Sequence, residues 1–385
     1  MNLSKTFLFL ILIIFPLGQL VRLPLGWLMV NIYLQDLFVL GLAVSFLKRE
    51  GLKGLRVSKL FQSFRPFLII SVLSLAINIP VWGGRNTLTG SLYLVRYLAY
   101  FFIFLTVEGF NQGEKKQVLK MLFLSGWLAA VLGLIQYFIY PDFRSWELFN
   151  WDPHLYRVVG TFWDPGFTGM IYLQALVLIV ILNWSKIKNI NWRFFSFWVL
   201  PIYLALVLTY SRSVYLALLI AIGVIAWFKK TKKFFLVGSG ILLVTIIFLP
   251  RLSSIGTKIE RRDSVYSRLE NWRHSLTIVR QNPLLGVGFN NYRWAQKEAG
   301  FLEDDWEKNH AGAGADSSIL FILATTGIFG LIAYLLFFKE LLRGSGLLIL
   351  ATFIPWLIHS FFNNSLFYPW LIIWGWIVLG AVSDR

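Results

Sequence analysis

Arginine is the side chain in this chain best suited to bind phosphate, and most arginines fall on one side of the predicted membrane topology. With the N-terminus inside, the inner loops carry 14 Lys and 6 Arg, whereas the outer loops and outer helix ends carry 13 Arg and 3 Lys. The basic character of cytoplasmic loops explains the lysines but not the outer arginines. A guanidinium is a permanently charged planar fork that matches phosphate oxygens, whereas an ammonium is a point charge. The pattern predicts a phosphate-bearing ligand at the outer face.

Four arginines are candidates for holding that ligand. Arg212, in the run 209–213, lies between two apolar segments with no room for a loop, so its charge falls at the outer membrane boundary. Arg268 and Arg273 lie on a predicted amphipathic helix, and Arg157 precedes a turn that leads into another apolar segment. Snorkelling at a helix end, or a solvated helix face, is the alternative explanation for these charges.

An acidic residue at the same boundary offers the complementary chemistry. Asp316 precedes Ser317 and Ser318 at the start of a long apolar segment. An aspartate followed by serines is also a good helix N-cap, so a structural role stays open. A carboxylate among outer arginines would serve as a general base for an attacking hydroxyl. His310 is the alternative base, and His359 is a further candidate.

The composition indicates an integral membrane protein. Hydrophobic residues make up 57% of the 385 residues and charged residues 14%, far from the balance of a soluble domain. The net charge of +17 lies in short loops between apolar runs, which favours topology signals and anionic lipid over nucleic acid as its explanation. The chain has no cysteine, and its four histidines lack the spacing of metal ligands. We expect neither a metal nor a cofactor.

Twelve apolar segments can each be read as a membrane helix, which needs roughly 20 mostly apolar residues. The lysine-rich loops and both termini then share one side. The first segment follows Lys5 and has no small-residue cleavage site, so we expect an uncleaved span rather than a signal peptide. The predicted fold is all-α, a single polytopic membrane domain over residues 1–385. The segments are 6–21, 26–47, 66–83, 89–107, 117–140, 166–184, 195–210, 212–229, 233–250, 316–338, 345–362 and 366–382.

The one extended hydrophilic region, residues 251–315, is predicted to be a large outer loop. Its part 264–280 has helical periodicity and ends at Pro283, which predicts an amphipathic helix that lies on the membrane surface or roofs a cavity. Arg96 falls in the outer half of the fourth segment, where a charge is costly unless it is paired or faces water. The apolar face of the predicted helix consists of Val265, Leu269, Trp272, Leu276 and Val279.

Five short motifs follow one another between residues 150 and 380. On these motifs the chain resembles the superfamily of O-antigen ligases and O-antigen polymerases, which are integral membrane glycosyltransferases. Each motif is weak alone, but five in order on a matching topology form a specific signal. The motifs are Arg157-x-x-Gly160-Thr161-Phe162 with Asp164-Pro165, Thr209-x-Ser211-Arg212, Arg268-x-x-x-Trp272, Asn282-Pro283-x-x-Gly286-x-Gly288, and Asp316-Ser317-x9-Gly327-x-x-Gly330.

The resemblance implies a GT-C-like helical fold in the bacterial cytoplasmic membrane, with 251–315 as a periplasmic loop and the active site at the periplasmic face. It implies a metal-independent glycosyltransferase, which by a single in-line attack would invert the anomeric configuration. The donor would be a glycan on undecaprenyl diphosphate, and the acceptor another glycan or a lipid. By this resemblance the catalytic residues would be Asp316, Arg212 and Arg268, and Arg157 and Arg273 would help to bind the diphosphate.

Two positions depart from the family pattern. O-antigen ligases typically carry histidine where this chain has Asp316, and often asparagine where it has Gly166. A polysaccharide polymerase therefore stays open beside a ligase. A secondary transporter or a flippase for lipid-linked sugars is the alternative from another class. Such transporters commonly contain internal repeats, and the two halves of this sequence show no convincing repeat.

Overall fold

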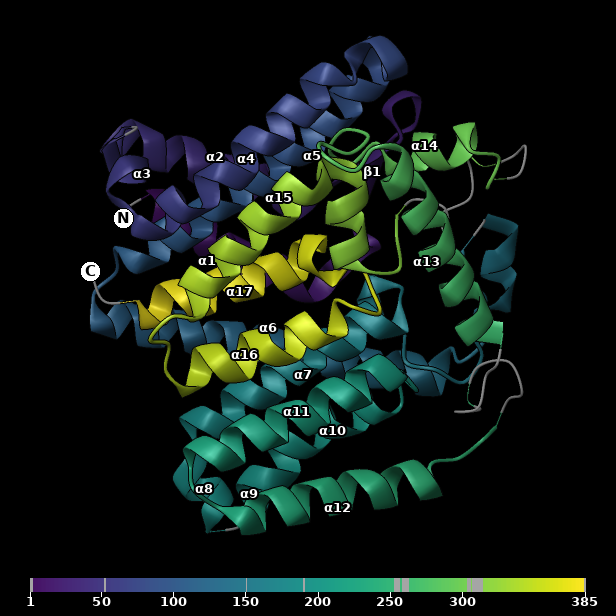
Figure 1. The fold of residues 1–385 in the computed structure, drawn as a ribbon. Helices are drawn as coiled ribbons and strands as arrows, with labels where there is room; N and C mark the ends of the chain where they lie inside the picture. The colour runs from purple at the N-terminus through teal and green to yellow at the C-terminus, as the bar shows by residue number, and fades with distance from the viewer. Residues whose placement is uncertain are drawn as a thin grey trace.

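The computed structural model describes residues 3–383 except 52, 150, 190, 253–256, 258–262, 303–305 and 307–313. The described chain is a helix bundle with one two-stranded hairpin (Figure 1). This agrees with the predicted all-α class. His310, the alternative base, lies outside the described residues, as do parts of the predicted loop 251–315.

Six helical segments among the described residues are long and apolar enough to cross a membrane, and four shorter apolar helices accompany them. The six are α1 Leu3–Ile14 with η1 Phe15–Leu20, α4 Lys59–Ile77, α5 Ile79–Glu108, α6 Gln112–Ile139, α7 Pro165–Leu182 and α15 Ser318–Leu342. The shorter ones are Trp192–Val207 (α9 Trp192–Phe194, η5 Phe195–Val199 and α10 Leu200–Val207), α11 Arg212–Phe228, α16 Leu347–His359 and α17 Pro369–Val382.

Two further helices, α2 Leu34–Glu50 and α12 Lys232–Phe248, overlap the remaining predicted segments. Each predicted segment thus contains a helix, and the number of membrane crossings stays a prediction. The other short elements are α3 Lys53–Val57, η3 Arg144–Phe149, η4 Gly160–Phe162, α8 Trp184–Lys188 and η7 Ser365–Phe367.

The predicted helix over 26–47 was placed too early. Strands β1 Arg22–Leu25 and β2 Val30–Tyr33 pair antiparallel around the short turn η2 Gly26–Leu28, and α2 begins only at Leu34. Pro24 and Gly26 are the two residue types that an interior helix turn tolerates least, so this apolar stretch folds into a hairpin instead.

Both termini lie at one end of the bundle (Figure 1). There, Lys5 Nζ lies 2.9 Å from Glu114 Oε1, and Lys115 Nζ donates to the carbonyl of Ser383. These contacts join the N-terminus, the start of α6 and the C-terminus, as the predicted topology requires. The hairpin, α13 Asp263–Gln281 and α14 Tyr292–Glu298 lie at the opposite end.

Backbone hydrogen bonds join the loop after α13 to a break in α15. The break is at Gly327, where φ is 66°, and Gly286 in the loop has a φ of 68°. The amides of Val287 and Gly288 donate to carbonyls of the opened helix at 3.0 and 3.1 Å. A Cβ atom on either Gly286 or Gly327 would collide with backbone of the other segment. These two motif glycines therefore fix α13 relative to α15, the helices associated with Arg268 and Asp316.

The amphipathic helix predicted over 264–280 is present as α13, and side chains outside the predicted apolar face pack against the rest of the protein. Its buried residues include Ser275 and Ile278, and Ser275 Oγ lies 2.6 Å from the hydroxyl of Tyr292. Leu269 and Leu276, on the predicted apolar face, are 53% and 43% exposed. Periodicity identifies a helix, but it does not say whether the apolar face meets protein, lipid or ligand.

Candidate functional site

The structure contains three adjoining cavities, and α13 lines the first two of them. The first, the apolar groove, has a volume of about 340 Å³. The second, the arginine pocket, has about 140 Å³ and a polar lining. The third, the aromatic chamber, has about 390 Å³. Arg212 and Arg268 line both groove and pocket, whereas Asp164 and Asn363 line both pocket and chamber, so the three spaces follow one another in this order.

The arginine pocket brings together three of the four arginines that the sequence singled out. Arg157 is buried, and its Nε donates to the carbonyl of Thr209 at 2.9 Å, which ties the turn before α7 to the turn before α11. Arg212 is the first residue of α11, and Arg268 enters from α13. Three elements that are distant in sequence thus place their guanidinium groups around one small space.

The N-terminus of α11 adds to the positive potential of this pocket, whereas α7 is already capped by Asp164, which accepts from the amide of Phe167 at 2.8 Å, and Asp152 and Asp164 bring negative charge to the lining. Ser211 and Arg212 begin α11, and both line the pocket. The first amides of an α-helix have no partner within the helix and attract anions. Together with the guanidinium groups, those of α11 suit an anion with several oxygens.

Arg273 does not share this pocket. It lies on the exposed side of α13, outside the linings of the three cavities. Five positions along an α-helix rotate a side chain by roughly 140°, so Arg268 and Arg273 cannot face the same ligand from one straight helix. The structure therefore gives no support to the expected role of Arg273 in diphosphate binding.

Asp316 lines the aromatic chamber at the start of α15. Its backbone N–H donates to Asn271 Oδ1 of α13 at 2.8 Å. The N-cap of α15 is the next residue, Ser317, whose hydroxyl accepts from the amide of Leu320 at 3.4 Å. The Asp316 carboxylate is thus not the helix cap that the sequence left open, and it is available for other chemistry.

The surroundings of Asp316 change its affinity for protons. Burial raises the pKa of its carboxyl to about 6; Arg268 opposes this increase, and the charges of Asp152 and Asp164 add to it. A carboxylate with this pKa is still mostly ionised at neutral pH, and it accepts a proton more readily than an ordinary aspartate. Among the described residues, no group of three or more histidine or acidic side chains is placed to hold a metal ion.

Asn363, which was not predicted from the sequence, lies at the boundary between pocket and chamber. Its Nδ2 lies 3.0 Å from Ser213 Oγ and 3.2 Å from His359 Nε2. His359 is fully buried behind it, which argues against this histidine as the base. His154 lines the arginine pocket and was also missed. The sequence signal for Asn363 was that it is a polar residue beside an apolar segment, and many residues of this chain share that feature.

The described chain combines several helices that are apolar enough to cross a membrane with an arginine-lined pocket beside a carboxylate. Residues 195–335 match a protein-family model described as O-antigen ligase. No curated protein matches the chain. The match includes Arg212, Arg268 and Asp316, and it supports the resemblance to O-antigen ligases that the motifs predicted. This family supports a function in polysaccharide assembly.

Proposed function

We propose that the protein is a glycosyltransferase of cell-surface polysaccharide assembly. It would transfer a glycan from undecaprenyl diphosphate to an acceptor hydroxyl at the periplasmic face of the bacterial cytoplasmic membrane. The order of the three cavities carries this proposal: an apolar groove for the lipid, an arginine pocket for the diphosphate and a chamber with a carboxylate for the acceptor. The first two cavities follow the order in which lipid and diphosphate are joined in such a donor, and the transferred sugar would lie where the pocket meets the chamber.

The apolar groove suits the first isoprenoid units of the lipid. Its walls come from α11 and α13 and from Phe362, whose ring centroid lies 6.4 Å from that of Trp272. Side chains such as Leu269 remain half exposed there. Covering them with a hydrocarbon chain would contribute about 0.8 kcal/mol per buried CH₂ group.

The arginine pocket suits the leaving group. Arg212 and Arg268 line the same two cavities, and like charges that share a small space repel each other. A diphosphate between them replaces repulsion with attraction. Its negative charge grows as the bond between the anomeric carbon and the phosphate oxygen breaks, and fixed guanidinium groups stabilise that growth without reorganising. On this proposal the arginines perform the charge stabilisation for which other glycosyltransferases use a metal.

Asp316 is the proposed base. The acceptor oxygen attacks the anomeric carbon from the side opposite the diphosphate, and its proton passes to the Asp316 carboxylate. The new glycosidic bond forms as the diphosphate leaves, which inverts the anomeric configuration. Asp316 lies on the chamber side of the path, beyond the residues that line the pocket, so leaving group and base act from different spaces.

The rate should depend on pH through Asp316. The carboxylate accepts a proton only when it is ionised, and burial raises the pKa of this group to about 6. We expect kcat/KM to level off above about pH 6 and to fall about tenfold per pH unit well below it. The measurement is initial rate against pH between about 5 and 8 in nanodiscs. A profile without this acid limb would contradict the assignment.

Arg268 and Arg273 form a matched pair on one helix. Arg268→Ala should raise the donor KM or lower kcat by about tenfold or more, because a charge-assisted contact to phosphate contributes roughly 1.5–3 kcal/mol. Arg273→Ala should leave both constants unchanged. Thermal unfolding of both variants should follow that of the unmodified protein. Equal losses of activity in the two variants would show that the orientation of α13 given above is wrong.

The decisive experiment supplies purified protein in nanodiscs with a lipid-diphosphate glycan, in the presence of a chelator. Formation of a longer lipid-linked glycan indicates a polymerase, and transfer to a lipid A core indicates a ligase. A strict requirement for an added divalent cation would contradict the metal-free mechanism. Movement of the lipid-linked sugar across proteoliposomes without any covalent change would favour the flippase or transporter alternative.

A further inference from the structure

The aromatic chamber is lined by many aromatic side chains, for which the proposed role of Asp316 as a base gives no reason. Beyond Asp316 and Asp164, its wall contains polar side chains interspersed with aromatic rings from the hairpin, α5, α14 and the segment before α17. Its volume of about 390 Å³ is in the usual range of ligand pockets. The hydroxyl-bearing and indole side chains among the aromatic ones are Tyr33, Tyr93, Tyr97, Tyr100, Tyr368 and Trp294.

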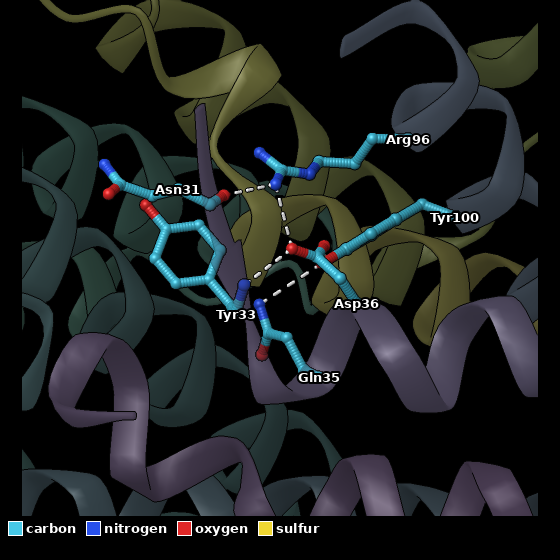
Figure 2. Close-up of polar contacts among 6 residues, drawn as sticks. All are labelled: Asn31, Tyr33, Gln35, Asp36, Arg96 and Tyr100. Atoms are coloured by element: carbon cyan, nitrogen blue, oxygen red, sulfur yellow. Dashed lines mark hydrogen bonds and ion pairs between the residues drawn. The ribbon is translucent and has the colours of Figure 1, made fainter. Parts of the chain in front are cut away.

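A buried ion pair holds several of these rings in place. Arg96 Nη2 lies 2.9 Å from Asp36 Oδ2, with the two side chains 15% and 8% exposed (Figure 2). Arg96 is thus paired, as its position in an apolar segment required. The same guanidinium lies 5.4 Å from the ring centroid of Tyr33 and 5.2 Å from that of Tyr93. Tyr100 donates its hydroxyl to Asp36 Oδ1 at 2.7 Å.

The ion pair also fixes the hairpin as a wall of the chamber. Arg96 donates to the carbonyl of Asn31, and the amide of Tyr33 donates to Asp36 at 2.8 Å (Figure 2). A buried ion pair contributes little net stability compared with an apolar replacement, whereas it enforces a particular arrangement. Its consequence here is the placement of strand β2 and three tyrosines around the cavity.

The chamber carries charges of both signs and little net charge. Arg96 is paired with Asp36, and the other charged side chains in the lining are Arg293, Asp164 and Asp316. A ligand that fills this space is therefore selected by rings and hydroxyls rather than by net charge. A pyranose has this chemistry, because its C–H faces are apolar and its hydroxyl edge both donates and accepts hydrogen bonds. A wall of aromatic faces with a few fixed polar groups is suited to such a molecule.

We propose that the aromatic chamber is a subsite for a sugar ring of the acceptor glycan, with Tyr93 and Trp294 as walls and the Asp36–Arg96 pair as positioning residues. This inference rests on the proposed function, because the base takes its proton from the acceptor. Asp316 lines the chamber and not the arginine pocket, so the acceptor hydroxyl must enter from the chamber. The ring that bears this hydroxyl then occupies the space between Asp316 and Arg96.

The test separates acceptor from donor. In nanodiscs, Tyr93→Ala and Trp294→Ala should each raise the acceptor KM by about tenfold, while the donor KM changes by less than about twofold. Tyr203→Ala is the matched control: Tyr203 lies on α10, and its hydroxyl is 2.8 Å from Thr245 of α12, away from the chamber. It should leave both constants unchanged. A raised donor KM with an unchanged acceptor KM in both chamber variants would overturn the proposal.

A second measurement does not depend on catalysis. The free oligosaccharide repeat of the host's own surface polysaccharide, without lipid or diphosphate, should bind the unmodified protein in calorimetry, and about tenfold more weakly in Trp294→Ala. If Trp294-dependent binding is observed without any glycosyl transfer, the proposed transferase function is wrong and the sugar subsite is supported. If transfer occurs but binding and acceptor KM are the same in all variants, the subsite is wrong and the transferase function stands.

Discussion

Asp316→Asn should lower turnover by about 100-fold or more, which is the usual contribution of a general base. The amide keeps the size of the carboxylate but cannot accept the proton of the acceptor hydroxyl. Donor affinity should survive, because Arg157, Arg212 and Arg268 are unchanged. The measurement is kcat and donor KM in nanodiscs, at a pH well above 6 so that the carboxylate of the unmodified protein is ionised.

The same variant should not be less stable than the unmodified protein at neutral pH. Burial raises the pKa of Asp316 from 3.8 to about 6, so the folded state disfavours the ionised form, and this cost is fully present above pH 6. Asparagine removes the cost. It also leaves the cap of α15 untouched, since Ser317 provides that cap. A thermal midpoint equal to or above that of the unmodified protein, combined with lost turnover, would therefore identify a chemical rather than a structural defect.

Near-normal turnover in Asp316→Asn would instead remove Asp316 from the mechanism and leave His310 as the sequence-based alternative. Asp316→His is the informative companion, because O-antigen ligases typically have histidine at this position. Activity in the histidine variant with none in the asparagine variant would show that the position requires a proton acceptor and tolerates either type.

The parts of the site that the sequence predicted depend on local chemistry. An arginine between two apolar segments has to lie at a membrane boundary, whatever the rest of the chain does. The same argument required a partner for Arg96, and Asp36 is that partner. The order of the motifs placed Arg157, Arg212 and Arg268 in one site, and the structure brings all three to one pocket.

The parts that the sequence did not predict depend on how elements pack. Helical periodicity gives the apolar face of α13 but not what it meets, and this face turned out to line an open groove. The spacing of Arg268 and Arg273 already places them on different faces of a helix, but only the packing of α13 against α11 and α15 shows which of the two lines the pocket. The aromatic chamber combines residues from the hairpin, α5, α14 and α17, and among so many aromatic residues its tyrosines look like ordinary membrane core.

Arg212→Lys should lose most activity while expression and topology stay the same. The substitution preserves the positive charge at the first position of α11, so the helix start and the positive outer boundary remain. It removes the planar fork that engages two oxygens at once, and each lost charge-assisted bond costs roughly 1.5–3 kcal/mol. A loss of one such bond corresponds to about tenfold or more in rate or donor affinity.

Arg273→Lys is the control for this change, because it makes the same substitution on the exposed face of the neighbouring helix. If only electrostatic attraction mattered, both lysine variants would be equally active. If the fork at Arg212 binds the diphosphate, the two variants should separate in donor KM or kcat and coincide in thermal stability. Full activity of Arg212→Lys would reduce Arg212 to a snorkelling residue. The groove and pocket, which share this residue, would then lose the contact that joins lipid recognition to the leaving group.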